Sequence, residues 1–223
     1  MGLETLPPNV VDKDEQDRAL ATAQYWDEQY AKSSSDTPTH EWLRGFSDLE
    51  SFFQSTLPSR RSQDNPLILH LGSGDSTIPA DLASLGFHHQ VCIDFSTTVV
   101  NMMTERHRSI PGITWYEQDL RDMGAVVADK SVDVAFDKST LDAMIYGNPW
   151  NAPADVKENT GKYLAEVHRV LKDDGVLLCL SFRQPHFMKP LLTTGGLWDI
   201  EVRVLGGSGC FNYFGFVMTK KRP

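Results

Sequence analysis

Short, nearly continuous apolar runs alternate with helical stretches along most of this chain. The runs "LILHL" (67–71), "VCIDF" (91–95) and "VLLCLS" (176–181) place apolar residues at consecutive positions rather than at every second one. Strands of this kind need cover on both faces, which is the situation in a parallel sheet flanked by helices. The alternation therefore predicts a doubly wound α/β fold.

Seven strands and four intervening helices are expected in this α/β domain. The predicted strands are 67–71, 90–95, 113–117, 132–137, 176–181, 199–205 and 213–219, and the predicted helices are 78–85, 97–108, 154–171 and 184–192. The last two strands are joined by "GGSGC" (206–210), which leaves no room for a helix, so they are expected to be antiparallel neighbours. The sequence thus predicts a seven-strand, mostly parallel sheet that ends in an antiparallel hairpin.

Two helical stretches, 17–32 and 40–57, precede the first strand. The segment "SSSDTP" separates them, and a polar linker follows at 59–65. We expect residues 1–58 to form an N-terminal helical arm and residues 59–223 to form the α/β domain. The aromatic residues of the arm also suit helix faces that simply pack against a core.

Composition and charge disfavour several classes of protein. The 223 residues have a formal net charge of −9, which opposes nucleic-acid binding. No apolar run approaches the roughly 18 residues of a membrane helix. The first residues lack the features of a secretion signal, so a cytoplasmic protein is expected. Cys92, Cys179 and Cys210 lie far apart, suit core positions rather than a disulfide framework or a zinc site, and give no reason to expect a metal.

The segment "LHLGSGDSTIPADLASLGF" (69–87) places Gly72 and Gly74 between a predicted strand and a predicted helix. Glycines at this point let the backbone turn sharply and approach a ligand, although a plain turn uses them too. A dinucleotide fingerprint needs a third small residue at position 77, where this chain has Thr77. No G-x-x-x-x-G-K-[ST] phosphate loop occurs either. Both observations disfavour an NAD, FAD or nucleotide-hydrolysing site.

Acidic residues follow the next three strands. Asp94 lies about 20 residues beyond the glycines, where a carboxylate can accept the hydroxyls of a ribose, or cap the next helix. Asp119 and Leu120 follow the third strand, where they can meet an adenine, and Asp137 and Lys138 end the fourth. The carboxyl ends of parallel strands converge on one site. The pattern therefore suggests an adenosine without phosphates, as in S-adenosylmethionine.

With these motifs the chain resembles the seven-strand methyltransferases. It is similar, more narrowly, to the methyltransferase-like group that includes the elongation factor 1A lysine methyltransferases, through "QYWDEQY", "HEWL", "VCIDFS", "WYEQDLRDM", "VDVAFDKSTLDAM" and "FNYFGFVMTK". The resemblance covers nearly the whole chain. It implies S-adenosylmethionine as cofactor, S-adenosylhomocysteine as product and elongation factor 1A as substrate. The cofactor-binding residues expected from the motifs and the resemblance are Trp26, Tyr30, Trp42, Gly72, Gly74, Asp94, Phe95, Asp119, Leu120 and Lys138.

Two positions depart from the family pattern. His70 stands where many members of the superfamily have an acid, which leaves the contacts near the amino acid end of the cofactor open. Ser139 stands where the related pattern has a glycine, a change that matters little if its side chain caps the following helix.

Methyl transfer from a sulfonium is an in-line displacement that depends on positioning. For a lysine acceptor, we expect Asp137, Asp142 or Tyr213 to orient the amine while water takes its proton. Asp142 equally suits the first turn of a helix. Three functions stay open: protein-lysine methylation, methylation of a small metabolite at the same cofactor site, and a scaffold that binds the cofactor without turnover.

Overall fold

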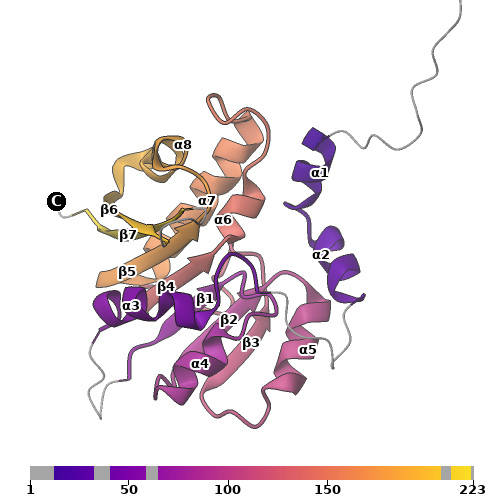
Figure 1. The fold of residues 1–223 in the computed structure, drawn as a ribbon, viewed down its shortest axis with the longest axis vertical. Coiled ribbons are helices and arrows are strands. Elements are labelled where there is room, and N and C mark those ends of the chain that lie inside the picture. The colour runs from indigo at the N-terminus through magenta and orange to yellow at the C-terminus, as the bar shows by residue number, and fades with distance from the viewer. Residues whose placement is uncertain (1–12, 33–40, 59–64, 207–211, 222–223) are drawn as a thin grey trace, which may run out of the picture.

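The computed structural model describes residues 13–32, 41–58, 65–206 and 212–221. Their strands form a seven-stranded sheet in the order β3-β2-β1-β4-β5-β7-β6 (Figure 1). Strands β1 to β5 are parallel, whereas β7 runs antiparallel to both of its neighbours, which confirms the predicted terminal hairpin. The strands are β1 (Ile68–Leu71), β2 (Gln90–Asp94), β3 (Ile113–Glu117), β4 (Val132–Lys138), β5 (Leu171–Ser181), β6 (Trp198–Leu205) and β7 (Tyr213–Lys220).

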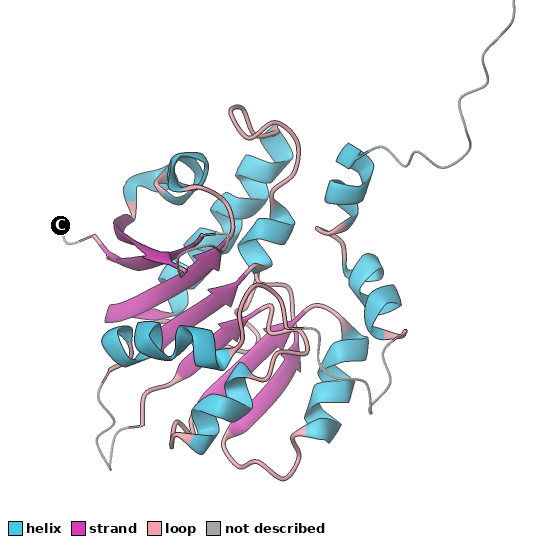
Figure 2. Ribbon diagram, viewed as in Figure 1, coloured by secondary structure: helices cyan, strands magenta, loops and turns pink. Residues whose placement is uncertain are grey.

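Helices cover both faces of the sheet (Figure 2). On β1, Ile68 packs with the side of the sheet that α3 and α4 cover, while its neighbour Leu69 packs with the side of α7 and α8. Because consecutive side chains point to opposite faces, both faces demand apolar residues, and this explains the unbroken apolar runs. The helices are α4 (Ile78–Ser84), α5 (Thr97–Arg106), α6 (Thr140–Met144), α7 (Ala154–Val170) and α8 (Pro185–Leu192), after α1 (Lys13–Ala19), α2 (Ala23–Tyr30) and α3 (Phe46–Thr56).

The arm differs from the sequence prediction at two points. The single helix expected over 17–32 is divided into α1 and α2, because Thr22 caps α2 by accepting a hydrogen bond from the N–H of Tyr25. The helix expected over 40–57 begins only at Phe46. Leu43 has a φ of 61°, so the backbone before α3 is not helical.

Helix α3 packs against the sheet, whereas α1 and α2 stand beside the carboxyl ends of the strands (Figure 1). Leu49, Phe52 and Phe53 of α3 are buried together with Ile68 and Val134 of the sheet. Cys92 and Cys179 are buried core residues, while Cys210 falls outside the described residues. Among the described helices, none is both long and apolar enough to cross a membrane.

Candidate active site

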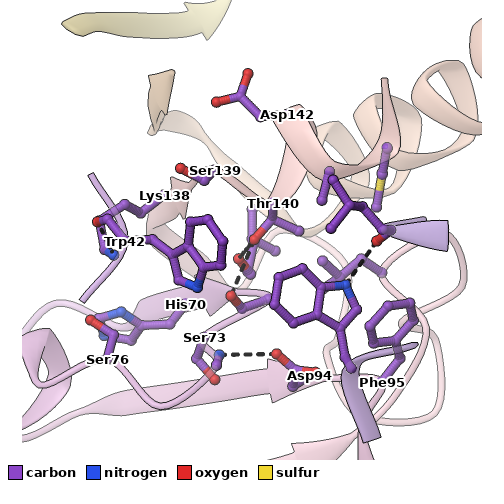
Figure 3. Close-up of a pocket in the computed structure, with 18 of the residues that line it drawn as sticks. Trp42, His70, Ser73, Ser76, Asp94, Phe95, Lys138, Ser139, Thr140 and Asp142 are labelled. Atoms are coloured by element: carbon purple, nitrogen blue, oxygen red, sulfur yellow. Dashed lines mark hydrogen bonds between the residues drawn. The ribbon is translucent and has the colours of Figure 1, made fainter. Parts of the chain in front are cut away.

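A cavity of about 290 Å³ lies where the strands of the parallel sheet end, beneath the arm (Figure 3). Strand β1 has β2 on one side and β4 on the other, so the order of the strands reverses at β1. Ligands of open α/β sheets bind at such a switch point. All ten residues expected to bind a cofactor line this cavity: Trp26, Tyr30, Trp42, Gly72, Gly74, Asp94, Phe95, Asp119, Leu120 and Lys138.

The floor of the cavity is the glycine turn after β1. Gly72 and Gly74 have φ values of 61° and 51°, a region that side chains disfavour. A Cβ on Gly72 would lie 2.9 Å from the Cβ of Thr140 and still closer to its hydroxyl. The Oγ1 of Thr140 donates to the carbonyl of Leu71 at 2.8 Å. The end of β1 is therefore locked to the start of α6.

Asp94 joins the glycine turn to the next helix. Its carboxylate accepts hydrogen bonds from the N–H of Gly74 at 2.9 Å and the N–H of Ser96 at 3.0 Å. Burial raises the pKa of Asp94 to about 6, against the opposing effect of these hydrogen bonds. The carboxylate is thus held rigidly at the end of β2, facing the cavity.

At the end of β3, Asp119 is paired with Arg121. The guanidinium Nε lies 2.9 and 3.1 Å from the two carboxylate oxygens, and this interaction lowers the pKa of Asp119. Arg121 also donates to Asn159 of α7 at 2.7 Å. Leu120 is buried beside them and supplies an apolar wall.

Aromatic rings of the arm form the roof. The ring of Trp26 stacks on Tyr30 and meets Trp42 edge-on, with ring centroids 5.8 Å apart in both pairs. The indole N–H of Trp26 donates to the carbonyl of Leu20 at 2.8 Å, which fixes its orientation. Aromatic faces attract cations, so this roof suits a positively charged group in the cavity.

Glu41 fastens the arm to the sheet. Its carboxylate pairs with the ammonium of Lys138 at 2.6 Å and accepts from the hydroxyl of Ser76 at 2.9 Å and the N–H of Thr77 at 3.0 Å. Lys138 also donates to the carbonyl of Trp42 at 2.8 Å. Sequence reasoning missed Glu41, because nothing in "HEWL" reveals a partner nearly a hundred residues away.

His70 lines the cavity as a neutral ring. Its Nε2 lies 2.7 Å from the Oε1 of Gln90, whose amide nitrogen donates to the carbonyls of Pro79 and Phe87. The oxygen of Gln90 must therefore accept, so Nε2 carries the proton and Nδ1 is the acceptor nitrogen of the ring. Burial lowers the pKa of His70 to about 4. The family's acid is replaced here by an uncharged acceptor.

The three residues predicted to orient a substrate amine have different locations. Asp142 lines the cavity at the end opposite Asp94 (Figure 3) and accepts from the hydroxyl of Ser181 at 2.6 Å, while burial raises its pKa. Asp137 is fully buried and accepts from the hydroxyl of Tyr163 and the N–H groups that begin α6. Tyr213 lies under the guanidinium of Arg44.

Asp137 and Tyr213 are not among the described residues that line the cavity. The geometry therefore does not support contact of either one with the substrate amine, and for Tyr213 this contact stays a prediction. A carboxyl with no exposed surface cannot reach a ligand, and burial raises the pKa of Asp137 to about 7. Asp137 instead anchors α6, the short helix whose first turn contains Asp142, as the sequence allowed.

Two hydroxyls support a polar ligand in this cavity. Ser73 and Ser139 both line it, and the Oγ of each is buried without a hydrogen-bond partner among the described residues. Ser139 has a φ of 69° and stands at the N-cap position of α6, but its side chain makes no cap hydrogen bond. Buried hydroxyls are normally hydrogen-bonded, so their lack of partners fits a site that a polar group fills.

Comparison with known proteins identifies the family. A sequence profile described as a methyltransferase domain matches residues 62–198. The chain belongs to the methyltransferase family. EEF1A lysine methyltransferase 4 of Mus musculus is 31% identical to it, over 97% of this chain and 81% of that protein. The mitochondrial citrate synthase-lysine N-methyltransferase CSKMT of Homo sapiens is 26% identical, over 91% of this chain and 88% of that protein.

The fold of this methyltransferase is shared with solved structures of very different sequence. One is phosphoethanolamine N-methyltransferase 2 of Haemonchus contortus, in complex with phosphomonomethylethanolamine and S-adenosylhomocysteine. It is 14% identical with a TM-score of 0.60, and the match covers 97% of this chain and 62% of that chain. This likeness shows the fold alone, so the cofactor and the substrate have to be argued from the residues of the cavity.

Proposed function

We propose that this methyltransferase uses S-adenosylmethionine to methylate a lysine of translation elongation factor 1A. The observation that carries the proposal is the convergence of all ten expected cofactor-binding residues on one cavity at the switch point of the sheet. The name of the mouse relative, EEF1A lysine methyltransferase 4, supports the choice of acceptor. The acidic chain, with a net charge of −9, suits a basic protein partner rather than a nucleic acid or an acidic membrane surface.

The cavity provides a group for each part of the cofactor. Asp94 would accept the ribose hydroxyls, with Phe95 beside the adenine, and Asp119 and Leu120 would bind the adenine rim. Gly72 and Gly74 would let the turn after β1 pass beneath the methionine portion, since a Cβ at these positions would collide with Thr140 and Tyr30. Unpartnered hydroxyls of Ser73 and Ser139, and the Nδ1 of His70, are available for its polar end.

The aromatic roof would stabilise the sulfonium. Trp26, Tyr30 and Trp42 present their rings to the cavity, and such contacts contribute about 0.5–2 kcal/mol each where water is excluded. When bound, the cofactor supplies an electrophilic methyl group. We propose residues 1–58 as the arm that closes this site and residues 59–223 as the catalytic domain; within the arm, α3 packs on the sheet and α1 and α2 lie over the cavity.

Asp142 is the residue that we propose for contact with the substrate amine. Its carboxylate lies in the cavity wall and is held by Ser181 and by the N–H of Phe182 at 3.3 Å. A neutral lysine amine could donate to it, which would aim the nitrogen lone pair at the methyl carbon while water removes the proton. Asp137 acts as a positioning residue, because it holds the first turn of α6, in which Asp142 lies.

A labelling experiment tests this function. The purified chain is incubated with labelled S-adenosylmethionine and recombinant elongation factor 1A, and the modified residue is mapped by mass spectrometry. We expect a methylated lysine, and a loss of turnover in Asp142→Asn with the donor Kd unchanged. A parallel incubation uses a cell extract in place of elongation factor 1A. If label then appears in a small solute and in no protein, the substrate is a metabolite and not a protein. Absence of donor binding would refute the proposal entirely. A translation factor as substrate also makes the cytoplasm the proposed location.

A further inference from the structure

A second hollow adjoins the cofactor cavity. It is a groove of about 260 Å³ between the loop that follows α6 and the face of α8. Ile145 and Arg183 line both the groove and the cavity, so the two hollows lie next to each other. In Figure 1 the loop between α6 and α7 extends beyond the end of the sheet, next to α8. A segment of a ligand lying in this groove would lead directly to the cavity.

Trp150 is the most exposed large apolar side chain in the described part of the chain, at 78%. Its ring nevertheless has a fixed place, because it meets Phe187 of α8 edge-on with centroids 4.8 Å apart and lies 5.6 Å from the ring of His186. The loop itself is held by the side chain of Asn148, which accepts from the N–H of Trp150 at 2.9 Å. An exposed and preorganised tryptophan is typical of an interaction surface.

Other exposed apolar side chains surround the same opening. Trp42 and Phe182, exposed by 43% and 51%, both line the cavity, and Trp150 lines the groove. An acceptor small enough to lie wholly in the cavity would leave Trp150 unused. Several exposed apolar side chains beside an active site are instead what a macromolecular partner covers.

The charge changes sign between the cavity and the groove. The cavity wall has the carboxylate of Asp142, which pairs with Arg183, a residue that lines both hollows, at 3.5 Å. The groove itself has the ammonium of Lys157, with no carboxylate among its described lining residues. The acids of α7 near Lys157 are engaged elsewhere: Asp155 accepts from the hydroxyl of Tyr146, and Glu158 pairs with Lys162. The groove therefore complements a negative group, and the cavity an amine.

We propose that the groove binds the polypeptide segment next to the target lysine of the protein substrate. An apolar side chain of that segment packs against Trp150 and Phe187, and an acidic side chain faces Lys157, while the lysine enters the cavity toward Asp142. This inference rests on the proposed function and adds to it the chemistry of the recognised sequence, an apolar and an acidic residue flanking a lysine.

Steady-state kinetics with full-length recombinant elongation factor 1A test the groove. Trp150→Ala should lower kcat/KM by about tenfold or more, mainly through KM, because truncation of a central aromatic anchor typically has this effect. Lys157→Glu should also raise KM, and this increase should shrink at high salt. Tyr116→Ala is the matched control, since Tyr116 is an aromatic residue of β3 that is 40% exposed and lines neither hollow. It should leave the kinetics unchanged.

Donor binding, measured by calorimetry on the same variants, separates the possible outcomes. Unchanged donor Kd with a raised KM for the protein supports the groove. If Trp150→Ala and Lys157→Glu keep the wild-type KM, the groove is not the docking site, although the enzyme still methylates protein. If the unsubstituted chain binds donor but labels no protein, the proposed function fails first and the inference fails with it. A concentration-dependent dimer that Trp150→Ala abolishes would instead assign the groove to a second copy of this chain.

Discussion

The ion pair between Glu41 and Lys138 gives a quantitative test of how the arm is held. We consider Glu41→Gln, which keeps one acceptor oxygen, enough for Ser76 or for Thr77 but not for both, and removes the charge that faces Lys138. The two side chains are only 18% and 8% exposed, so neither charge is well hydrated once its partner is lost. The arm segment that includes Trp42 is therefore expected to detach from the end of β4.

The size of the effect follows from the burial of the pair. Removing one member of a buried pair destabilises a protein by about 3–5 kcal/mol, because the other charge is left unpaired. Glu41 retains some solvent contact, and Lys138 still donates to the carbonyl of Trp42 at 2.8 Å, so we expect a loss nearer 2 kcal/mol. Since the arm forms the roof of the cavity, the donor Kd should rise by about tenfold.

A double-mutant cycle in urea isolates the pair. The cycle combines Glu41→Gln with Lys138→Met, and the matched control combines Glu158→Gln with Lys162→Met, an exposed pair with 64% and 57% of the side chains accessible. We expect a coupling energy of about 2 kcal/mol for the first pair and no measurable coupling for the exposed control pair. Equal coupling in the two cycles, or an unaltered donor Kd in Glu41→Gln, would show that the arm is held by its aromatic contacts instead.

Three further substitutions test the cavity. Gly72→Ala places a methyl group on a backbone with a φ of 61° and against Thr140. Thermal unfolding should show that the free energy of unfolding falls by about 3 kcal/mol, and calorimetry should detect no binding of S-adenosylmethionine. A wild-type Tm and Kd would contradict this. Asp94→Asn places an amide where a carboxylate now accepts from the Gly74 N–H. Calorimetric titration should then show a Kd for S-adenosylmethionine that is about 10-fold to 100-fold higher. An unchanged Kd would remove Asp94 from the site. The pKa of His70 is about 4 when folded and 6.5 when unfolded, so the unfolded state binds the extra proton between these values. Stability should therefore fall by about 1.4 kcal/mol per pH unit from pH 6.5 to pH 4, and His70→Gln should remove this contribution from urea unfolding curves; identical slopes in both proteins would refute it.

The fold and most of the cavity could be predicted because both follow from local patterns. Runs such as "LILHL" are fixed by the need for cover on both faces, and they end where the parallel strands end. Acids and glycines placed directly after those runs, such as Gly72 and Asp94, must then meet at one edge of the sheet. Proximity of this kind needs no knowledge of how the helices pack.

Features that depend on distant partners could not be predicted. Glu41 pairs with Lys138, and Asp137 is enclosed by Tyr163 of α7, so their roles come from tertiary contacts that leave no periodic signal. Asp137 resembles a catalytic acid because it ends a strand beside Lys138, but the strand turns its side chain into the core. The division of the arm into α1 and α2 depends on the cap formed by Thr22.

The left-handed backbone at Ser139 has a consequence for engineering this enzyme. A serine at a φ of 69° costs about 1 kcal/mol or more that a glycine would avoid, yet its hydroxyl is buried at the cavity wall without a hydrogen-bond partner among the described residues. Selection of variants for heat resistance alone would favour glycine at position 139 and would discard that hydroxyl. Thermostable lineages obtained without an activity screen are therefore expected to trade donor affinity for melting temperature at this one residue.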